Sequence, residues 1–190
     1  MDWNRRYAEK DTPWDKGLAH PVLGQPSSQG ILKGRVLVPG CGTGHDVRAL
    51  ARWGLEVVGL DLAPLALRQA RAHPPVGHES YLEGDLFSCS NVLGAPFDGV
   101  FEHTCFCAIE RQRRVDYVAA VAAALRPGGY LLAVFFLTPG QGDEGPPYGC
   151  TPKELDELFL SSFRLLQEEE HIPTFPGREG RELLRLLERV

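Results

Sequence analysis

Three glycines in the first half of the chain have the spacing of a ligand-binding turn. Gly40, Gly42 and Gly44 follow a short apolar run at residues 35–38 and precede a stretch with apolar side chains at helical spacing. Glycines between a strand and a helix allow a tight turn and close approach of a ligand, and the helix start offers free N–H groups. A plain strand–turn–helix connection would use the same residues, so the glycines need support from elsewhere.

Asp61 supplies that support. It follows Gly40 by 21 residues and stands after a second apolar run, residues 56–60. A carboxylate there can accept hydrogen bonds from both hydroxyls of a ribose. The pattern Gly-x-Gly-x-Gly differs from the Gly-x-Gly-x-x-Gly that makes room for a pyrophosphate. The loop therefore favours a ligand that contains an adenosine and no phosphate.

Asp85 is a second acidic candidate, placed just after a third expected strand at residues 78–82. Its carboxylate could accept a hydrogen bond from an adenine amino group, and Leu86 would then pack on the face of the ring. Taken alone, an aspartate here is a common turn residue. Together with the glycines and Asp61 it indicates the adenine end of the same site.

A parallel sheet would bring these residues together. The pattern predicts strands at residues 35–38, 56–60, 78–82, 97–101 and 130–137, helices at 45–53, 64–72 and 111–125, and a Gly/Pro-rich loop at 138–149. Thr151, Pro152 and Glu154 have the spacing of a capped helix start. Alternating strands and helices predict an α/β fold with a mostly parallel sheet, whose strand-end loops meet at one edge. Residues 163–172 and 182–190 are ambiguous between helix and strand.

Length and charge narrow the class of protein. A chain of 190 residues corresponds to about one domain. Its 20 basic and 25 acidic side chains give a net charge of −5, which argues against nucleic-acid and anionic-membrane partners. We expect no transmembrane helix and no secretory signal. The five cysteines form no Cys-x-x-Cys pair, which favours reduced thiols in a cytoplasmic protein.

The chain resembles the class I methyltransferases that use S-adenosylmethionine, and among them the thiopurine and thiol/halide methyltransferases. The segments that carry this resemblance are Thr12-Pro13-Trp14-Asp15-Lys16-Gly17, Val38-Pro39-Gly40-Cys41-Gly42-Thr43-Gly44-His45-Asp46, Val58-Gly59-Leu60-Asp61, Phe97-Asp98, Glu102-His103-Thr104-Cys105-Phe106-Cys107-Ala108-Ile109-Glu110 and Gly145-Pro146-Pro147-Tyr148. They run through most of the chain.

The resemblance implies a Rossmann-like fold: a seven-stranded, mostly parallel sheet with helices on both faces, its last two strands antiparallel and located in the ambiguous tail. It implies a single methyltransferase domain over residues 1–190, with a core at 31–190 and a lid at 1–30. In that family, aromatic residues of the N-terminal segment close over the cofactor, where a sulfonium cation gains from contact with an indole face.

The cofactor-binding residues implied for this chain are Trp3, Tyr7, Trp14, Gly40, Gly42, Gly44, Asp61, Leu62, Asp85, Leu86 and His103. Gly40 would approach the methionine part of the cofactor. His103 aligns with a position that faces the sulfonium and the acceptor, where the family often has Tyr or Arg. An ordinary histidine pKa of about 6.5 suits orienting an acceptor or taking a thiol proton, so His103 is the candidate catalytic residue.

The predicted reaction is methyl transfer from S-adenosylmethionine to a small soft nucleophile: a thiol, hydrosulfide, a thiopurine or a halide. Two alternatives stay open, an inactive S-adenosylmethionine-binding protein and an NAD-dependent oxidoreductase, although the glycine spacing counts against the latter. Nucleic-acid methylation is disfavoured because the Pro-Pro-Tyr motif begins with Gly145. Cys105 and Cys107 make a poor metal site without histidine partners. We expect four of the six histidines to lie on the surface or in loops: His20, His73, His78 and His171.

Overall fold

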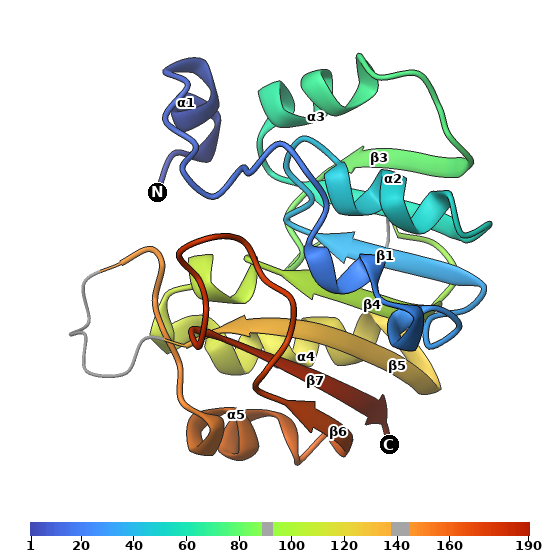
Figure 1. Cartoon of the computed structure of the whole chain (residues 1–190), viewed down its shortest axis with the longest axis vertical. Coiled ribbons are helices and arrows are strands. Elements are labelled where there is room, and N and C mark those ends of the chain that lie inside the picture. The colour runs from blue at the N-terminus through green and yellow to red at the C-terminus, as the bar shows by residue number, and fades with distance from the viewer. Residues whose placement is uncertain (89–92, 138–144) are drawn as a thin grey trace.

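The computed structural model describes residues 1–88, 93–137 and 145–190 (Figure 1). Cys89 and residues 138–144 of the expected Gly/Pro-rich loop lie outside these ranges. The strands are β1 (Arg35–Pro39), β2 (Glu56–Asp61), β3 (His78–Glu83), β4 (Phe97–His103), β5 (Leu125–Phe136), β6 (Phe163–Glu169) and β7 (Glu182–Arg189). They form one seven-stranded sheet in the order β3-β2-β1-β4-β5-β7-β6.

The pairing confirms the predicted fold class. Strands β1 to β5 are parallel to one another, β7 is antiparallel to β5, and β6 is antiparallel to β7. The chain leaves β1 toward β2 and β3 on one side and returns to β4 and β5 on the other. The strand order therefore reverses between β1 and β4, which is where α/β sheets bind ligands.

The helices are α1 (Trp3–Ala8), α2 (His45–Ala51), α3 (Pro64–Arg71), α4 (Arg114–Ala124) and α5 (Pro152–Phe159). The predicted cap of α5 is present, since the Thr151 hydroxyl accepts the Glu154 N–H at 3.2 Å. β5 begins at Leu125, earlier than the predicted Tyr130. Leu125 pairs with Phe97 before an irregularity in the ladder, and Gly128 with a φ of 72° lies in the irregular stretch.

Helices cover both faces of the sheet (Figure 1). On one face, α4 and α5 bury Tyr117, Val121 and Phe159 against the strands. On the other face, α2 packs its apolar residues, and residues 22–23 of the N-terminal segment join them. The α1 helix contacts α3, so the N-terminal segment lies over the carboxyl end of β2. Within the described ranges, no helix combines the length and apolar character that crossing a bilayer requires.

Candidate active site

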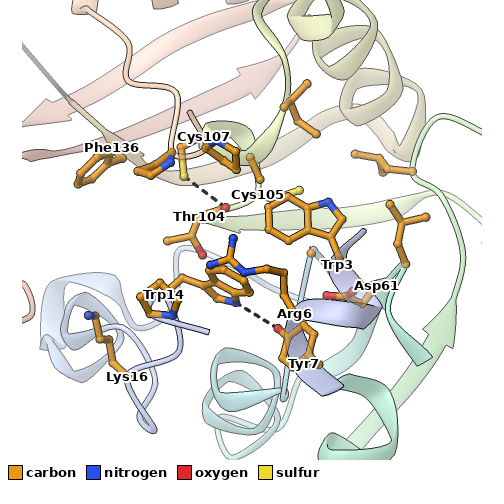
Figure 2. Close-up of a pocket in the computed structure, with 18 of the residues that line it drawn as sticks. Trp3, Arg6, Tyr7, Trp14, Lys16, Asp61, Thr104, Cys105, Cys107 and Phe136 are labelled. Atoms are coloured by element: carbon orange, nitrogen blue, oxygen red, sulfur yellow. Dashed lines mark hydrogen bonds between the residues drawn. The ribbon is translucent and has the colours of Figure 1, made fainter. Parts of the chain in front are cut away.

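A cavity of about 380 Å³ opens at the carboxyl ends of the parallel strands (Figure 2). The loops after β1, β2, β3 and β4 line it together with the N-terminal segment and the connection before β7. It brings together eight of the residues that the sequence pointed to: Trp3, Tyr7, Trp14, Gly40, Asp61, Leu62, Asp85 and Leu86. The sites after successive strands thus meet at one edge, as the pattern predicted.

The glycine loop after β1 has a left-handed backbone. Gly40 has a φ of +60°, and a Cβ there would lie 3.0 Å from the Cys105 Sγ. Gly44 has a φ of +77° and is the N-cap of α2, where a Cβ would lie 2.6 Å from Tyr81 Cε1. Gly40 therefore lines the large cavity, whereas Gly44 shapes the turn behind it.

Asp61 is fixed by two backbone donors. Its Oδ2 accepts the Gly42 N–H and its Oδ1 accepts the Ala63 N–H, each at 2.8 Å. Burial raises the pKa of the carboxyl group, and these hydrogen bonds oppose the rise. Each oxygen keeps a second lone pair, so a carboxylate held this way can still accept hydrogen bonds from two ligand hydroxyls.

Asp85 combines a turn role with a place on the cavity wall. Its Oδ1 accepts the Phe87 N–H at 3.0 Å and so caps the turn after β3. Leu86 lines the cavity beside it, and Leu62, which is exposed, lines the cavity next to Asp61. Because β2 and β3 are neighbours at one side of the sheet, the carboxylates of Asp61 and Asp85 mark that side as the acidic end of the cavity.

The N-terminal aromatic residues contact one another over the cavity (Figure 2). The Trp14 indole N–H donates to the Tyr7 hydroxyl at 3.2 Å, and the rings of Trp3 and Trp14 meet edge to face with centroids 5.4 Å apart. Burial raises the pKa of Tyr7, which stays a neutral phenol. The Arg6 guanidinium lies over the Trp14 ring, 4.7 Å from its centroid.

Asp15 anchors this segment to the glycine loop, a role that sequence reasoning missed. Its Oδ2 accepts the Thr43 hydroxyl at 2.7 Å, and its Oδ1 accepts the Gly17 N–H at 2.8 Å and lies 3.3 Å from His45 Nε2. The hydrogen bonds from His45, Gly17 and Thr43 hold the pKa of Asp15 well below its usual range. Asp15 belongs to the Thr-Pro-Trp-Asp motif, which was the available signal.

His103 lies beside the large cavity rather than in its wall. The next residue, Thr104, lines the large cavity, while the His103 ring lines an adjoining one of about 50 Å³. His103 Nδ1 lies 2.8 Å from Asp46 Oδ2, and Nε2 is buried with no hydrogen-bond partner in the described part of the chain. Burial opposes ionisation of Asp46, but electrostatic attraction to His103 and the hydrogen bonds from His103 and the His20 N–H lower the pKa of the carboxyl group. An ionised Asp46 accepts the hydrogen bond, so Nδ1 carries a proton.

The expectation that His20 lies on the surface is wrong. Its side chain is fully buried, and both ring nitrogens have partners. His20 Nδ1 accepts the Val22 N–H at 3.2 Å, and Nε2 lies 3.0 Å from Glu182 Oε2. An Nδ1 that accepts leaves the proton on Nε2, which donates to Glu182. Although burial opposes it, hydrogen bonds from His20 and Thr174 lower the pKa of Glu182 to about 2. This pair joins the N-terminal segment to β7.

Arginines from the connection before β7 line another part of the cavity. Arg178 donates to Glu182 Oε1 at 2.9 Å, and the guanidinium groups of Arg178 and Arg181 lie 5.7 and 5.1 Å from the Phe136 ring centroid. Cys107 lines the cavity as well, and burial raises the pKa of its thiol to about 12. No sequence signal marked the two arginines, since they lie in the stretch between the two ambiguous segments, for which no element or motif was predicted.

Comparisons with known proteins agree with this geometry. The family model of thiopurine S-methyltransferase (TPMT) matches residues 1–186. Thiocyanate methyltransferase 1 of Arabidopsis thaliana is 33% identical over 189 residues, covering 96% of this chain and 82% of the relative. Thiopurine S-methyltransferase of Photobacterium profundum is 30% identical over 196 residues, covering 94% and 91%.

The fold is also that of solved methyltransferases. One is the 1,6-didemethyltoxoflavin-N1-methyltransferase of Burkholderia thailandensis, solved with bound 1,6-didemethyltoxoflavin and S-adenosylhomocysteine. It superposes with a TM-score of 0.75 at 20% identity, covering 99% of this chain and 85% of that one. With the family model matching nearly the whole sequence, the chain belongs to the thiopurine S-methyltransferase family and is an S-adenosylmethionine-dependent methyltransferase.

Proposed function

We propose that this enzyme methylates a small soft nucleophile that enters the cavity as an anion: a thiolate, hydrosulfide, thiocyanate, a thiopurine anion or a halide. The observation that carries this proposal is the charge layout of the cavity. Asp61 and Asp85 line its acidic end, and Arg178 and Arg181 line a basic part. The names of the relatives, thiocyanate and thiopurine methyltransferases, support an acceptor of this kind.

The wall of the cavity fits the cofactor. Bound S-adenosylmethionine supplies a methyl group on a sulfonium, which an acceptor can displace directly. We propose that Asp61 receives the ribose hydroxyls, that Asp85 and Leu86 hold the adenine, and that Gly40 lets the backbone approach the methionine part. Residues 1–30 would act as the lid, with their aromatic rings excluding water from the reacting atoms.

The acceptor must enter the cavity already ionised, because the described part of the cavity wall offers no base to deprotonate it. Besides the two carboxylates at the acidic end, the titratable side chains lining it in the described ranges are arginine, lysine, tyrosine and cysteine. Burial raises the pKa values of Cys105 and Cys107, so both thiols stay protonated near neutral pH. The arginines favour the charged form of an acidic acceptor, and alignment with the cofactor then suffices for displacement.

We propose a positioning role for His103 instead of proton transfer. Its Nε2 is buried outside the large cavity, and its Nδ1 is held by Asp46. In this position the ring fixes the end of β4, from which Thr104 and Cys105 enter the cavity wall. The four cysteines described are free thiols, which fits a reducing cytoplasm as the proposed location.

A product assay with separate acceptors tests the proposal. Purified enzyme and S-adenosylmethionine are incubated with iodide, thiocyanate, hydrosulfide or an aromatic thiol, and methylated products are identified by gas chromatography and mass spectrometry. Methylation of at least one soft anion is expected. Turnover of oxygen or nitrogen acceptors alone would contradict the proposal, and cofactor binding without any product would favour the inactive binding protein.

A further inference from the structure

Arg6 is held in the cavity by one edge of its guanidinium group. Nε donates to the Asp11 backbone carbonyl at 2.9 Å and lies 2.7 Å from the Asp11 carboxylate. The plane of the group is supported by the Trp14 ring beneath it. Figure 2 shows the side chain directed into the cavity between Trp3 and Thr104. Arg6 is therefore fixed in place rather than extended into solvent.

The terminal nitrogens of the Arg6 guanidinium, Nη1 and Nη2, have N–H groups available for hydrogen bonds to a ligand. Nη1 contacts only the weak acceptor Met1 Sδ, at 3.7 Å, and Nη2 has no hydrogen-bond acceptor in the described ranges. A guanidinium with an anchored Nε and free terminal N–H groups has the geometry that binds a carboxylate with two parallel hydrogen bonds. The side chain is about three-quarters buried, with 23% exposed, so such a pair would be only partly screened by water.

The cofactor has one carboxylate, on the amino-acid end of its methionine part. That group cannot lie at the acidic end, where Asp61 and Asp85 would repel it. Arg178 already pairs with Glu182 through the buried network before β7, and Arg181 of the same connection lies against the Phe136 ring, in the basic part that the proposed function assigns to the acceptor. Lys16, the other cation of the N-terminal segment in the wall, is exposed and has no hydrogen-bond or ion-pair partner among residues 1–88, 93–137 and 145–190. Arg6 is the cation that is both fixed and beside the aromatic residues of the lid.

We infer that Arg6 binds the carboxylate of the cofactor's methionine part. The contact would attach the lid to the ligand through α1, so that cofactor binding and lid closure depend on the same side chain. The inference concerns the cofactor and does not depend on which acceptor is methylated.

Calorimetry with two ligands that differ only in this group tests the inference. S-adenosylmethionine and its decarboxylated form are titrated into the parent, Arg6→Gln, Arg6→Lys and Lys16→Gln proteins. The parent is expected to prefer the carboxylated ligand by roughly 10- to 100-fold, the range of a hydrogen-bonded charge pair. Arg6→Gln should abolish that preference while binding the decarboxylated ligand within about threefold of the parent, and Arg6→Lys should keep part of it.

Each other result overturns the inference. Equal weakening of both ligands by Arg6→Gln would show that Arg6 only supports the lid through Trp14 and Asp11. Loss of the preference in Lys16→Gln, with Arg6→Gln unaffected, would assign the carboxylate to Lys16. A parent protein with no preference between the two ligands would leave no carboxylate contact to assign. All these results are read from binding, so they stay distinct from a failure of the acceptor proposal.

Discussion

Asp46 holds the His103 ring through Nδ1, the nitrogen across the ring from the unpaired Nε2 of the described structure. Asp46 Oδ2 lies 2.8 Å from Nδ1 of His103, and Oδ1 of the same carboxylate accepts the backbone N–H of His20 at 2.7 Å. An ionised Asp46 places a proton on Nδ1, and Nε2 is buried outside the large cavity with no hydrogen-bond partner in the described ranges. This arrangement makes His103 a poor acceptor for a proton from a bound thiol.

The pH dependence of kcat/KM should therefore follow the acceptor. With an aromatic and an aliphatic thiol as substrates, the apparent pKa of the rising limb should differ as the thiols themselves differ. His103→Asn should lower kcat/KM by about tenfold through loss of positioning and leave each apparent pKa unchanged. A pKa near 6.5 that is common to both thiols and disappears in His103→Asn would instead identify histidine as a base.

Replacement of Asp61 should weaken cofactor binding directly. Asp61→Ala removes the carboxylate that Gly42 and Ala63 orient, leaving two ribose hydroxyls without a charged acceptor. We expect S-adenosylhomocysteine to bind about 10- to 150-fold more weakly by calorimetry. Asp116→Asn, an exposed change on α4, is the control and should bind like the parent. Parent-like affinity in Asp61→Ala would contradict the assignment of the ribose contact.

Gly44 of the glycine loop and Gly54, which follows α2, form a matched pair for measuring how much stability an added side chain costs at a positive φ. Both have a positive φ, but a Cβ at Gly44 would lie 2.6 Å from Tyr81 Cε1, whereas at Gly54 nothing lies within 4 Å. Gly54→Ala should lose about 1 kcal/mol in denaturant unfolding from backbone strain alone. Gly44→Ala should lose about 2–4 kcal/mol because a clash is added. Equal losses would mean that Tyr81 moves aside freely.

Asp15→Asn should loosen the lid without unfolding the core. The change weakens the contacts to His45 and Thr43 that fix the N-terminal segment to the glycine loop. Hydrogen exchange of residues 3–17 should become faster, while amides of β1 and β4 keep their protection. Affinity for S-adenosylhomocysteine should fall about tenfold, the effect of losing one charged hydrogen bond. Unchanged exchange in residues 3–17 would argue against Asp15 as the anchor.

Glu182 should contribute stability that acid removes. Its pKa of about 2 in the folded protein lies below its ordinary value of 4.5, so folding favours the ionised form. The contribution, roughly 3 kcal/mol, is complete above about pH 5 and is lost as the pH falls toward 2. The difference in unfolding free energy between the parent and Glu182→Gln should therefore be largest near pH 7 and shrink below pH 4.5. A difference that stays constant with pH would refute this account.

Local spacing was enough to predict the residues that follow β1, β2 and β3. Gly40 and Asp61 each end or follow an apolar run, and Asp85 comes just after the third expected strand. Parallel strands bring such positions to one edge whatever the distant sequence does. The tail could not be assigned from its period, because β7 is buried on both faces and its leucines form a nearly continuous run. Its two strands came from the family resemblance.

The missed residues depend on contacts between distant parts of the chain. His20 can be buried because Glu182 accepts a hydrogen bond from its Nε2–H, and nothing near His20 in the sequence indicates that partner. The place of His103 follows from the alternation of side chains along β4: Glu102 turns toward Tyr117 on one face and His103 toward Asp46 on the other. The sequence located the end of that strand but not which cavity the ring enters.

The hydrogen bond between His20 and Glu182 also determines when the N-terminal segment can complete its attachment during folding. The two residues are 162 positions apart, and the second stands at the start of the last strand of the sheet. During synthesis on a ribosome, strands β1 to β4 can pair long before β7 is available. His20 of the N-terminal segment cannot bond to Glu182 until nearly the whole chain has been made. A nascent chain halted before Glu182 could thus form the glycine loop, Asp61 and the Asp15 contacts of the N-terminal segment, while the buried His20 still lacks its partner. The last attachment of residues 1–30 to the sheet is therefore expected to form late in synthesis, when Glu182 becomes available to His20.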